Sequence, residues 1–206
     1  IIFISKKFNI PIISDSCHAI KARYKNQSLG SLGLSSCYSF HPLKNLNVWG
    51  DGGFIITNNS SLAKKLYLLR NHGLKNRNNC EVFGYNSRLD TIQAVIANYK
   101  IKNKLDKITA KRILNAKRLD RLLKNVSQVQ TPPREKRFKE VFHLYQINTN
   151  KRDQLMKFLN QKNVDAKIHY PIPIHLQKAA KFLNHKRGDF PIAERVAKTT
   201  LSMPVH

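Results

Sequence analysis

Acidic residues are scarce in this chain: its 206 residues include 12 Asp and Glu against 37 Lys and Arg, which gives a net charge of +25. Such an excess raises the question of a nucleic acid or an anionic membrane as a partner. The basic residues are spread along the whole chain, however, and no basic-aromatic platform accompanies them. We therefore expect a solvated basic surface with some attraction for phosphorylated small molecules, and neither nucleic acid nor membrane as the partner.

Cysteine is also rare. Cys17, Cys37 and Cys80 are odd in number and lack CxxC spacing, so we expect neither a disulfide framework nor a zinc site. Reduced thiols of this kind are typical of the cytoplasm, which is the expected location. No apolar run approaches the roughly 18–20 residues that a transmembrane helix needs.

Glycine and proline are absent from residues 85–131, and this absence predicts long helices there. Seven of the eight glycines precede this stretch, and Pro132 and Pro133 follow it. We thus predict part of a large α/β domain over residues 1–106. Residues 107–206 are expected to hold a helical connector and a small C-terminal α+β domain.

Apolar periodicity and turn-forming residues predict the individual elements. Strands are expected over residues 11–14, 34–40, 54–57, 141–149 and 164–168, the first three of them buried. Helices are expected from Ser60 to about His72-Gly73, after Asp90, and over residues 152–161 and 193–199. The helix after Asp90 either continues near Asp106 or breaks and restarts there. The apolar faces of the middle helices are expected to consist of Ile92, Val95, Ile96 and Tyr99, and then of Leu105, Ile108, Ile113, Ala116, Leu119 and Leu123.

The first residues resemble the end of an element already under way. Residues 1–8 have the pattern of a helix that leads through Asn9 into a strand, and the chain starts without a methionine. We expect the chain to be a fragment that lacks its N-terminal part. On its own it would expose a sheet edge and half a ligand pocket, so it would be aggregation-prone and inactive.

Three polar groups lie at or just after the ends of the first two predicted strands. They are the carboxylate of Asp15 after the first strand, and the hydroxyl of Ser39 and the amine of Lys44 at the second. Such groups can hold pyridoxal phosphate. The aspartate keeps the pyridine nitrogen protonated, the serine meets the phosphate, and the lysine amine binds the aldehyde carbon. The glycines at 50, 52 and 53 would let the backbone turn tightly beneath the cofactor. Taken alone, these residues could equally be a turn cap, a strand-end hydroxyl and a surface lysine.

Several motifs together resemble the DegT/DnrJ/StrS-type nucleotide-sugar aminotransferases over essentially the whole chain. They are Ser14-Asp15-Ser16-Cys17-His18-Ala19, Ser39-Phe40-His41-Pro42-Leu43-Lys44-Asn45-Leu46, Gly50-Asp51-Gly52-Gly53, Arg70-Asn71-His72-Gly73, Gly84-Tyr85-Asn86-Ser87-Arg88-Leu89-Asp90 and His169-Tyr170-Pro171-Ile172-Pro173-Ile174-His175. The resemblance implies an α/β fold of the type I pyridoxal-phosphate transferases, similar to aspartate aminotransferase. Ser14 stands where the family usually has an acid.

The resemblance also implies roles for the residues in these motifs. Lys44 would carry the cofactor and shuttle a proton, Asp15 would pair with the pyridinium nitrogen, and His18 would lie beside the ring. Ser39 would bind the phosphate, and Asn86 would reach the phosphate of the neighbouring subunit in a homodimer. The loop with His169, Tyr170 and His175 would help to shape the sugar-nucleotide pocket.

For some of these residues a purely structural role is also open. His18 could be a satisfied, partly buried histidine, and Asn86 could belong to a helix-capping turn. His169 and His175 lack the spacing of a metal pair, so no metal is expected, but their loop could also serve structure alone.

The resemblance implies a function: transfer of an amino group to a keto group of a nucleotide-linked sugar. The expected donor is glutamate, and the product would serve polysaccharide, lipopolysaccharide or glycoside biosynthesis. A non-catalytic regulator or sensor with the same fold is the main alternative. A basic nucleic-acid-binding module is a third, and it would show steeply salt-dependent DNA binding.

Overall fold

The structure, a computed structural model, describes all 206 residues. Their contacts divide the chain into two compact units. The first comprises Ile1–Ala110 and Glu135–His143, and the second comprises Lys111–Arg134 and Leu144–His206. A short segment from the later part of the chain therefore belongs to the first unit. The domain boundary predicted after residue 106 stays a prediction.

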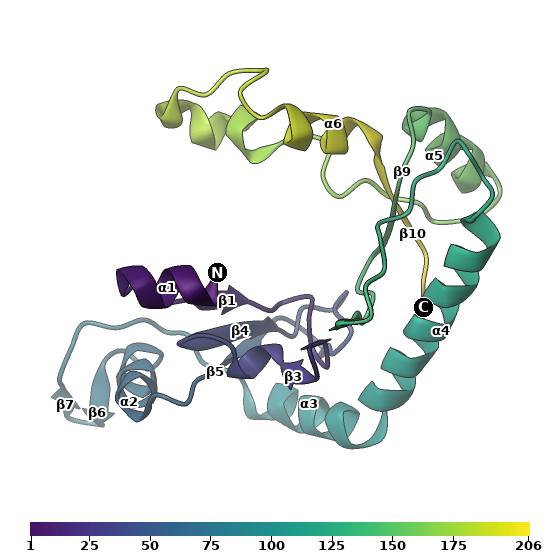
Figure 1. The fold of residues 1–206 in the computed structure, drawn as a ribbon. Helices are drawn as coiled ribbons and strands as arrows, with labels where there is room; N and C mark the ends of the chain where they lie inside the picture. The colour runs from purple at the N-terminus through teal and green to yellow at the C-terminus, as the bar shows by residue number, and fades with distance from the viewer. The chain divides into compact units, whose positions relative to one another are not determined.

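A three-stranded sheet organises the first unit (Figure 1). It consists of β1 (Ile13–Asp15), β4 (Ser35–Ser39) and β5 (Gly53–Ile56) in the order β1-β4-β5. β1 runs parallel to β4, whereas β5 runs antiparallel to β4. The three strands predicted for this part of the chain are thus confirmed.

The burial of this sheet differs from the prediction. In β4, Ser36 is fully covered and Tyr38 is 8% exposed. Ile13 in β1 is 66% exposed, however, and Ile55 in β5 is 48% exposed. The expectation of buried strands is wrong for β1 and β5, because nothing in these 206 residues packs against the sheet faces that carry Ile13 and Ile55.

Two helices flank these strands in the sequence. α1 (Ile2–Phe8) ends at Asn9, whose φ of 49° is left-handed, so the predicted helix end is confirmed. α2 (Ser60–Leu69) begins after Asn59, whose Oδ1 accepts a hydrogen bond of 2.8 Å from the Leu62 amide. This side-chain cap satisfies one of the free amides of the first turn.

The chain reverses after α2 through two left-handed residues. His72 has φ 58° and Gly73 has φ 73°, and the Gly73 amide donates to the Leu68 carbonyl at 2.8 Å. α2 thus ends at Leu69, earlier than the predicted end at about His72-Gly73, and His72 takes the first left-handed position of the reversal although glycine is the usual choice there. Gly73 is required for a different reason, since a Cβ built there would lie 1.5 Å from the Val82 carbonyl oxygen.

We expect Gly73→Ala to destabilise the protein, because the methyl group needs both a strained φ and a displaced backbone. The strain alone costs about 1–3 kcal/mol, and the clash adds to it. Gly188→Ala is the matched control, since Gly188 has φ 97° but nothing within 4 Å of an added Cβ. Urea unfolding should show a larger loss for Gly73→Ala than for Gly188→Ala, and equal losses would contradict this interpretation.

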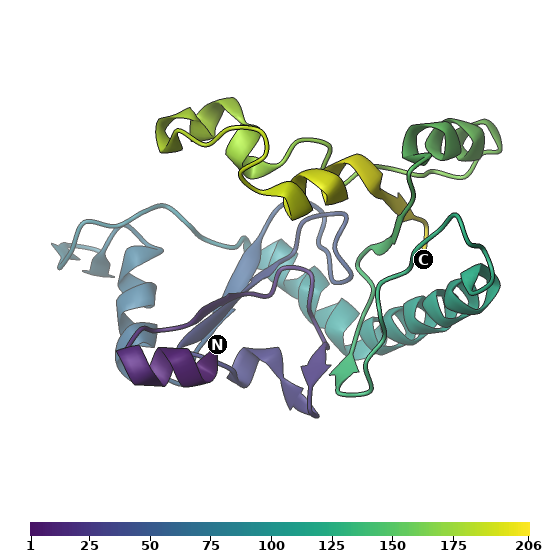
Figure 2. The ribbon, with the colours of Figure 1, turned by 45° about the horizontal axis from the view of Figure 1, so that its top comes forward.

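Two consecutive helices follow, α3 (Thr91–Asn103) and α4 (Leu105–Leu123), and Figure 2 shows α4 as one unbroken helix. Of the two possibilities left open near Asp106, the structure shows the break, at Lys104. The predicted inner stripe of α4 is also confirmed: its members, Leu105, Ile108, Ile113, Ala116, Leu119 and Leu123, are all buried or half-buried. No helix is both long and apolar enough to cross a membrane.

The predicted buried face of α3 is wrong in part. Ile92, Val95 and Tyr99 are 62%, 61% and 56% exposed, whereas Ala97 is buried and Ile96 is half-buried. The periodicity identified residues that share a face, but in these 206 residues no other element covers it.

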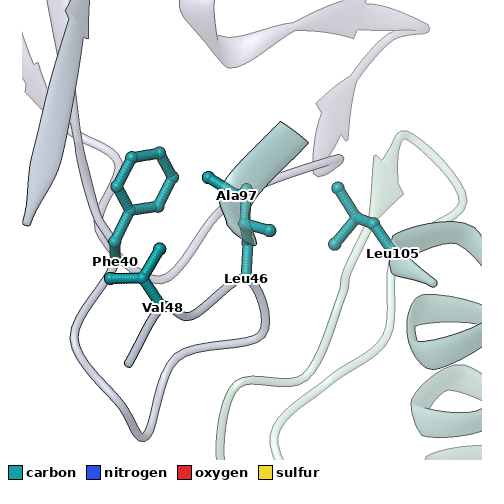
Figure 3. Packing of buried hydrophobic residues seen from close by; sticks show 5 residues of the cluster. All are labelled: Phe40, Leu46, Val48, Ala97 and Leu105. Atoms are coloured by element: carbon teal, nitrogen blue, oxygen red, sulfur yellow. The ribbon is translucent and has the colours of Figure 1, made fainter. Parts of the chain in front are cut away.

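A small hydrophobic cluster connects the sheet with the helices (Figure 3). Its members, all at most 5% exposed, are Phe40, Leu46, Val48, Ala97 and Leu105. Phe40 directly follows β4, and Leu46 and Val48 belong to the loop after it. Burial of each large side chain stabilises the fold by about 1.5–3 kcal/mol, so this cluster holds the loop between residues 40 and 48 in place.

Two short sheets complete the first unit. β2 (Arg23–Tyr24) pairs with β3 (Gln27–Ser28) on one side and with β8 (Phe138–Lys139) on the other. The second sheet contains β6 (Leu74–Asn76) and β7 (Asn79–Cys80), and a 3-10 turn spans Leu29–Ser31. These two-residue and three-residue strands were not predicted, because they are too short to show a period in the sequence.

The second unit contains the antiparallel pair β9 (Tyr145–Asn148) and β10 (Thr200–Met203). Its helices are α5 (Arg152–Gln161) and α6 (Pro191–Thr199), with 3-10 turns at Ile174–Leu176 and Lys178–Leu183. The predicted helices are confirmed. The strand predicted over residues 164–168 is wrong, since only an isolated bridge between Lys167 and Ser202 forms there.

Candidate active site

Asp15 and Ser39 end two neighbouring parallel strands. Asp15 is the last residue of β1 and lies opposite Cys37 of β4, and Ser39 ends β4. Because the carboxyl ends of parallel strands meet at one edge of a sheet, a carboxylate and a hydroxyl are presented there together. Ligands of α/β proteins commonly bind at this edge.

The Asp15 carboxylate is stabilised in its ionised form. Its Oδ1 accepts a hydrogen bond from the Cys17 amide at 3.1 Å. Hydrogen bonds from Cys17 lower the pKa of Asp15, and the positive charges of His18 and Lys44 lower it further. The three predicted residues Asp15, His18 and Lys44 are therefore close enough for their charges to interact.

Lys44 lies in the loop that follows β4, and its backbone is held at both ends. Its amide donates to the His41 carbonyl at 2.8 Å, and its carbonyl accepts from Asn47 Nδ2 at 3.0 Å. The next residue, Asn45, is 6% exposed and donates from Nδ2 to the Val141 carbonyl at 2.9 Å. The backbone of the loop at Lys44 is thus held in place.

The hydroxyl of Ser39 accepts a hydrogen bond of 3.1 Å from the His41 amide. Its own proton remains available for donation to an anionic oxygen. Neither Gly52 nor Gly53 has a positive φ, so neither is needed for a left-handed conformation. They allow close packing instead: an added Cβ would meet the Leu89 side chain at 2.7 Å at Gly52, and the Tyr38 carbonyl at 2.6 Å at Gly53.

These residues fit pyridoxal phosphate. An ionised carboxylate beside a primary amine suits a ligand that carries a protonated ring nitrogen and an aldehyde, and the serine hydroxyl suits its phosphate. The position of Asp15 and Ser39 at the ends of neighbouring parallel strands, with Lys44 in the loop that follows Ser39, is the observation that carries this fit.

Asn86 lies in a different part of the first unit. It forms an isolated bridge with Asn71, just after α2, and its Oδ1 accepts from Arg88 Nε at 3.2 Å. The segment that carries it is exposed, with Phe83 and Tyr85 at 100% and 72%. Local structure alone therefore fixes this position, and the role predicted for Asn86 stays a prediction.

The three predicted substrate residues belong to the second unit. His169 Nδ1 is hydrogen-bonded to Ser202 Oγ at 2.9 Å, and Tyr170 is 71% exposed. The side chain of His175 is only 8% exposed and pairs with Glu194 Oε1 at 3.2 Å.

Glu194 explains how the loop around His175 is held. Its Oε1 also accepts from the Gly188 amide at 2.7 Å, and this bond, followed by that from His175, lowers the pKa of the glutamate. The observed contacts of His175 thus stabilise its own loop, and its predicted contact with substrate stays a prediction.

Three residues near the candidate site were not predicted from the sequence. Cys17 donates to Asp15, and both burial and the bond to Asp15 raise the pKa of its thiol. Asn45 directly follows Lys44 and donates to the Val141 carbonyl. The His143 ring packs against the His18 ring. For Cys17 a signal existed, because an Asp two residues before an amide commonly forms such a turn.

Comparisons with known proteins agree with this fold and site. The sequence profile of the DegT/DnrJ/EryC1/StrS aminotransferase family matches residues 1–206. The chain is 41% identical to a "Pleiotropic regulatory protein" of Geobacillus stearothermophilus over 98% of its length and 55% of that protein. It is 35% identical, over 100% of its length and 54% of the relative, to the "UDP-N-acetyl-3-dehydro-alpha-D-glucosamine 3-aminotranferase" of Acidithiobacillus ferrooxidans.

A solved structure has the same fold. The X-ray structure of S. venezuelae DesV in complex with a ketimine intermediate superposes with a TM-score of 0.95 at 32% identity. The match covers 98% of this chain and 54% of DesV. The predicted α/β fold class is thereby confirmed, and the chain spans about half the length of the curated relatives it matches. The chain belongs to the DegT/DnrJ/EryC1/StrS aminotransferase family.

Proposed function

We propose that the protein carrying this chain is a pyridoxal-phosphate-dependent aminotransferase that moves an amino group from glutamate to a keto group of a nucleotide-linked sugar. The observation that carries the proposal is the position of Asp15 and Ser39 at the carboxyl ends of β1 and β4, with Lys44 in the loop that follows β4. Relatives named as transaminases or aminotransferases of dTDP-linked and UDP-linked sugars support the substrate class.

In this proposal each residue has a definite task. The Asp15 carboxylate accepts a hydrogen bond from the protonated ring nitrogen, and the Ser39 hydroxyl donates to the phosphate. Lys44 Nζ would hold the cofactor covalently until the amine of the donor replaces it, and the freed amine would then take up and release a proton. Bound pyridoxal phosphate supplies an electron sink and a carrier for the amino group. His18 lies beside the ring and limits its movement.

The proposal extends to the assembly and the substrate. We place Asn86 at the phosphate of the neighbouring subunit in a homodimer, which its exposed segment with Phe83 and Tyr85 supports. His169, Tyr170 and His175 are proposed to shape the sugar-nucleotide pocket. The three free cysteines fit a cytoplasmic location, and residues 1–206 alone are proposed to be inactive.

A regulatory protein with the same fold is the second candidate, because the relative from Geobacillus stearothermophilus carries that name. The two candidates differ in their reaction with glutamate once the cofactor is bound. An aminotransferase takes an amino group from glutamate, whereas a regulator binds the cofactor without this half-reaction. The presence of both Lys44 and Asp15 favours the enzyme, since a regulator needs no proton shuttle.

The decisive experiment uses the full-length protein reconstituted with pyridoxal phosphate. Addition of glutamate should convert the cofactor to its amino form, seen as a change in its absorption spectrum. Addition of dTDP-linked or UDP-linked keto sugars should then restore the first spectrum and yield an amino sugar detectable by mass spectrometry. Cofactor binding without any response to glutamate would favour the regulator, and no cofactor binding would contradict both the enzyme and the site.

A further inference from the structure

A segment from the later part of the chain, Glu135–His143, belongs to the first unit. Its strand β8 pairs with β2, and the Tyr24 and Phe138 rings of these strands lie 5.2 Å apart. The Lys25 amide donates to the Arg137 carbonyl at 2.7 Å. Backbone pairing and ring packing therefore hold this returning segment against the part of the chain that follows His18.

Beyond β8 the returning segment reaches the loop of the cofactor lysine. Val141 is 4% exposed, and its carbonyl accepts the hydrogen bond of 2.9 Å from Asn45 Nδ2. Asn45 directly follows Lys44 and is itself 6% exposed. A buried hydrogen bond of this kind costs free energy when broken, because the desolvated partners lose their pairing. The position of Val141 is thus fixed relative to Lys44.

His143 follows two residues later. Between them Phe142 adopts a φ of 50°, a left-handed conformation that bulky residues rarely take. The His143 ring lies 4.1 Å from the His18 ring, centroid to centroid, with an interplanar angle of 51°. Local backbone strain of this kind is kept where the surrounding structure demands it. The strained turn connects the hydrogen bond at Val141 with the ring contact at His18.

We propose that His143 is a positioning residue that holds the imidazole of His18 in its place beside Asp15 and Lys44. The inference rests on the proposed function, in which His18 lies beside the cofactor ring. His143 acts through His18 and touches no reacting atom. The ring contact removes rotamers that His18, an exposed residue, would otherwise adopt, so the cofactor meets a side chain that is already ordered.

The ring contact itself is tested by NMR on the full-length protein without cofactor. His143→Leu keeps a side chain of similar size but removes the ring, and His143→Phe keeps an aromatic ring. We expect the ring protons of His18 to lose their ring-current shift in His143→Leu and to retain one in His143→Phe. His185→Ala, which removes an imidazole from the second unit, should leave His18 unchanged. An unchanged His18 signal in His143→Leu would overturn the inference.

The consequence for the cofactor is tested by a double-mutant cycle on the dissociation constant of pyridoxal phosphate. His143→Leu should weaken binding about 2- to 10-fold, the range expected for one aromatic contact, whereas His143→Phe should bind as the unchanged protein does. In the His18→Ala background, His143→Leu should have no further effect. The same loss in both backgrounds would overturn the inference, because His143 would then act independently of His18.

The two tests also separate this inference from the proposed function. If the unchanged protein bound no pyridoxal phosphate, the proposed function would fail, and the NMR signal of His18 would still decide whether His143 holds it. If the protein bound the cofactor and transferred amino groups while the cycle showed independent effects, only the inference on His143 would fail.

Discussion

Replacement of Lys44 by alanine is expected to lower amino transfer by the full-length protein by about 10⁴-fold or more, since it removes both the covalent attachment and the proton shuttle. The fold should persist, because Lys44 is half-buried and the loop is held by backbone bonds and by the buried side chains of Leu46 and Val48. The measurement is a single-turnover reaction with glutamate, followed by the absorption of the cofactor.

Two further variants separate charge from chemistry in this test. Lys44→Arg keeps a positive charge near Asp15 but has no amine that can deprotonate, so it should be as inactive as the alanine variant. Lys64→Ala, at an exposed position on α2, should react as the unchanged protein does. Activity within tenfold of normal in either Lys44 variant would contradict the role given to this amine.

Asp15→Asn is expected to have the second largest effect, a loss of about 10²–10³ in the rate of the half-reaction, which is typical of removing one preorganised electrostatic partner. The amide keeps the shape of the side chain but carries no negative charge, so the ring nitrogen loses the group that keeps it protonated. Steady-state and single-turnover rates at neutral pH would show the loss.

The pH dependence gives a second measure of the same residue. Because the pKa of Asp15 is lowered below its ordinary value of about 4, its carboxylate stays ionised at all pH values above that range. An acidic limb from this group should therefore appear only below about pH 4.

Asp106→Asn is the matched control for Asp15→Asn, since Asp106 is an exposed partner of Lys21 at 3.0 Å in the first unit. A rate loss equal to that of Asp15→Asn in this control would count against the assignment.

The core of the candidate site could be predicted because its parts follow strand ends. Asp15 and Ser39 each end a strand, and Lys44 follows five residues after Ser39, so a parallel pairing of the two strands suffices to bring them together. Helix ends were predictable for a similar reason. Asn59 and Asn9 have local preferences for caps and left-handed positions, and these do not depend on distant residues.

The contacts of the returning segment could not be predicted in this way. Asn45 and Val141 are separated by 96 residues, and no local pattern states which carbonyl a buried asparagine will meet. The contact of His18 with His143 has the same origin. Short strands such as β2 and β8 depend on the same long-range pairing, and two residues are too few to show a period.

Burial was the least predictable property. The apolar residues of α3 share a face, as the period indicates, but Ile92 and Val95 stay exposed because nothing in these 206 residues packs against them. Ile13 on β1 is exposed for the same reason. A sequence pattern shows that a face is suited to burial, and only the complete set of neighbours determines whether it is buried.

The central claim is that the amine of Lys44 holds the cofactor while the carboxylate of Asp15 faces its ring. Reduction of the reconstituted full-length protein with borohydride, followed by peptide mass spectrometry, tests this most directly. A pyridoxyl group on Lys44, at one per chain, is the predicted result. A pyridoxyl group on another lysine, or none on any, would contradict the claim.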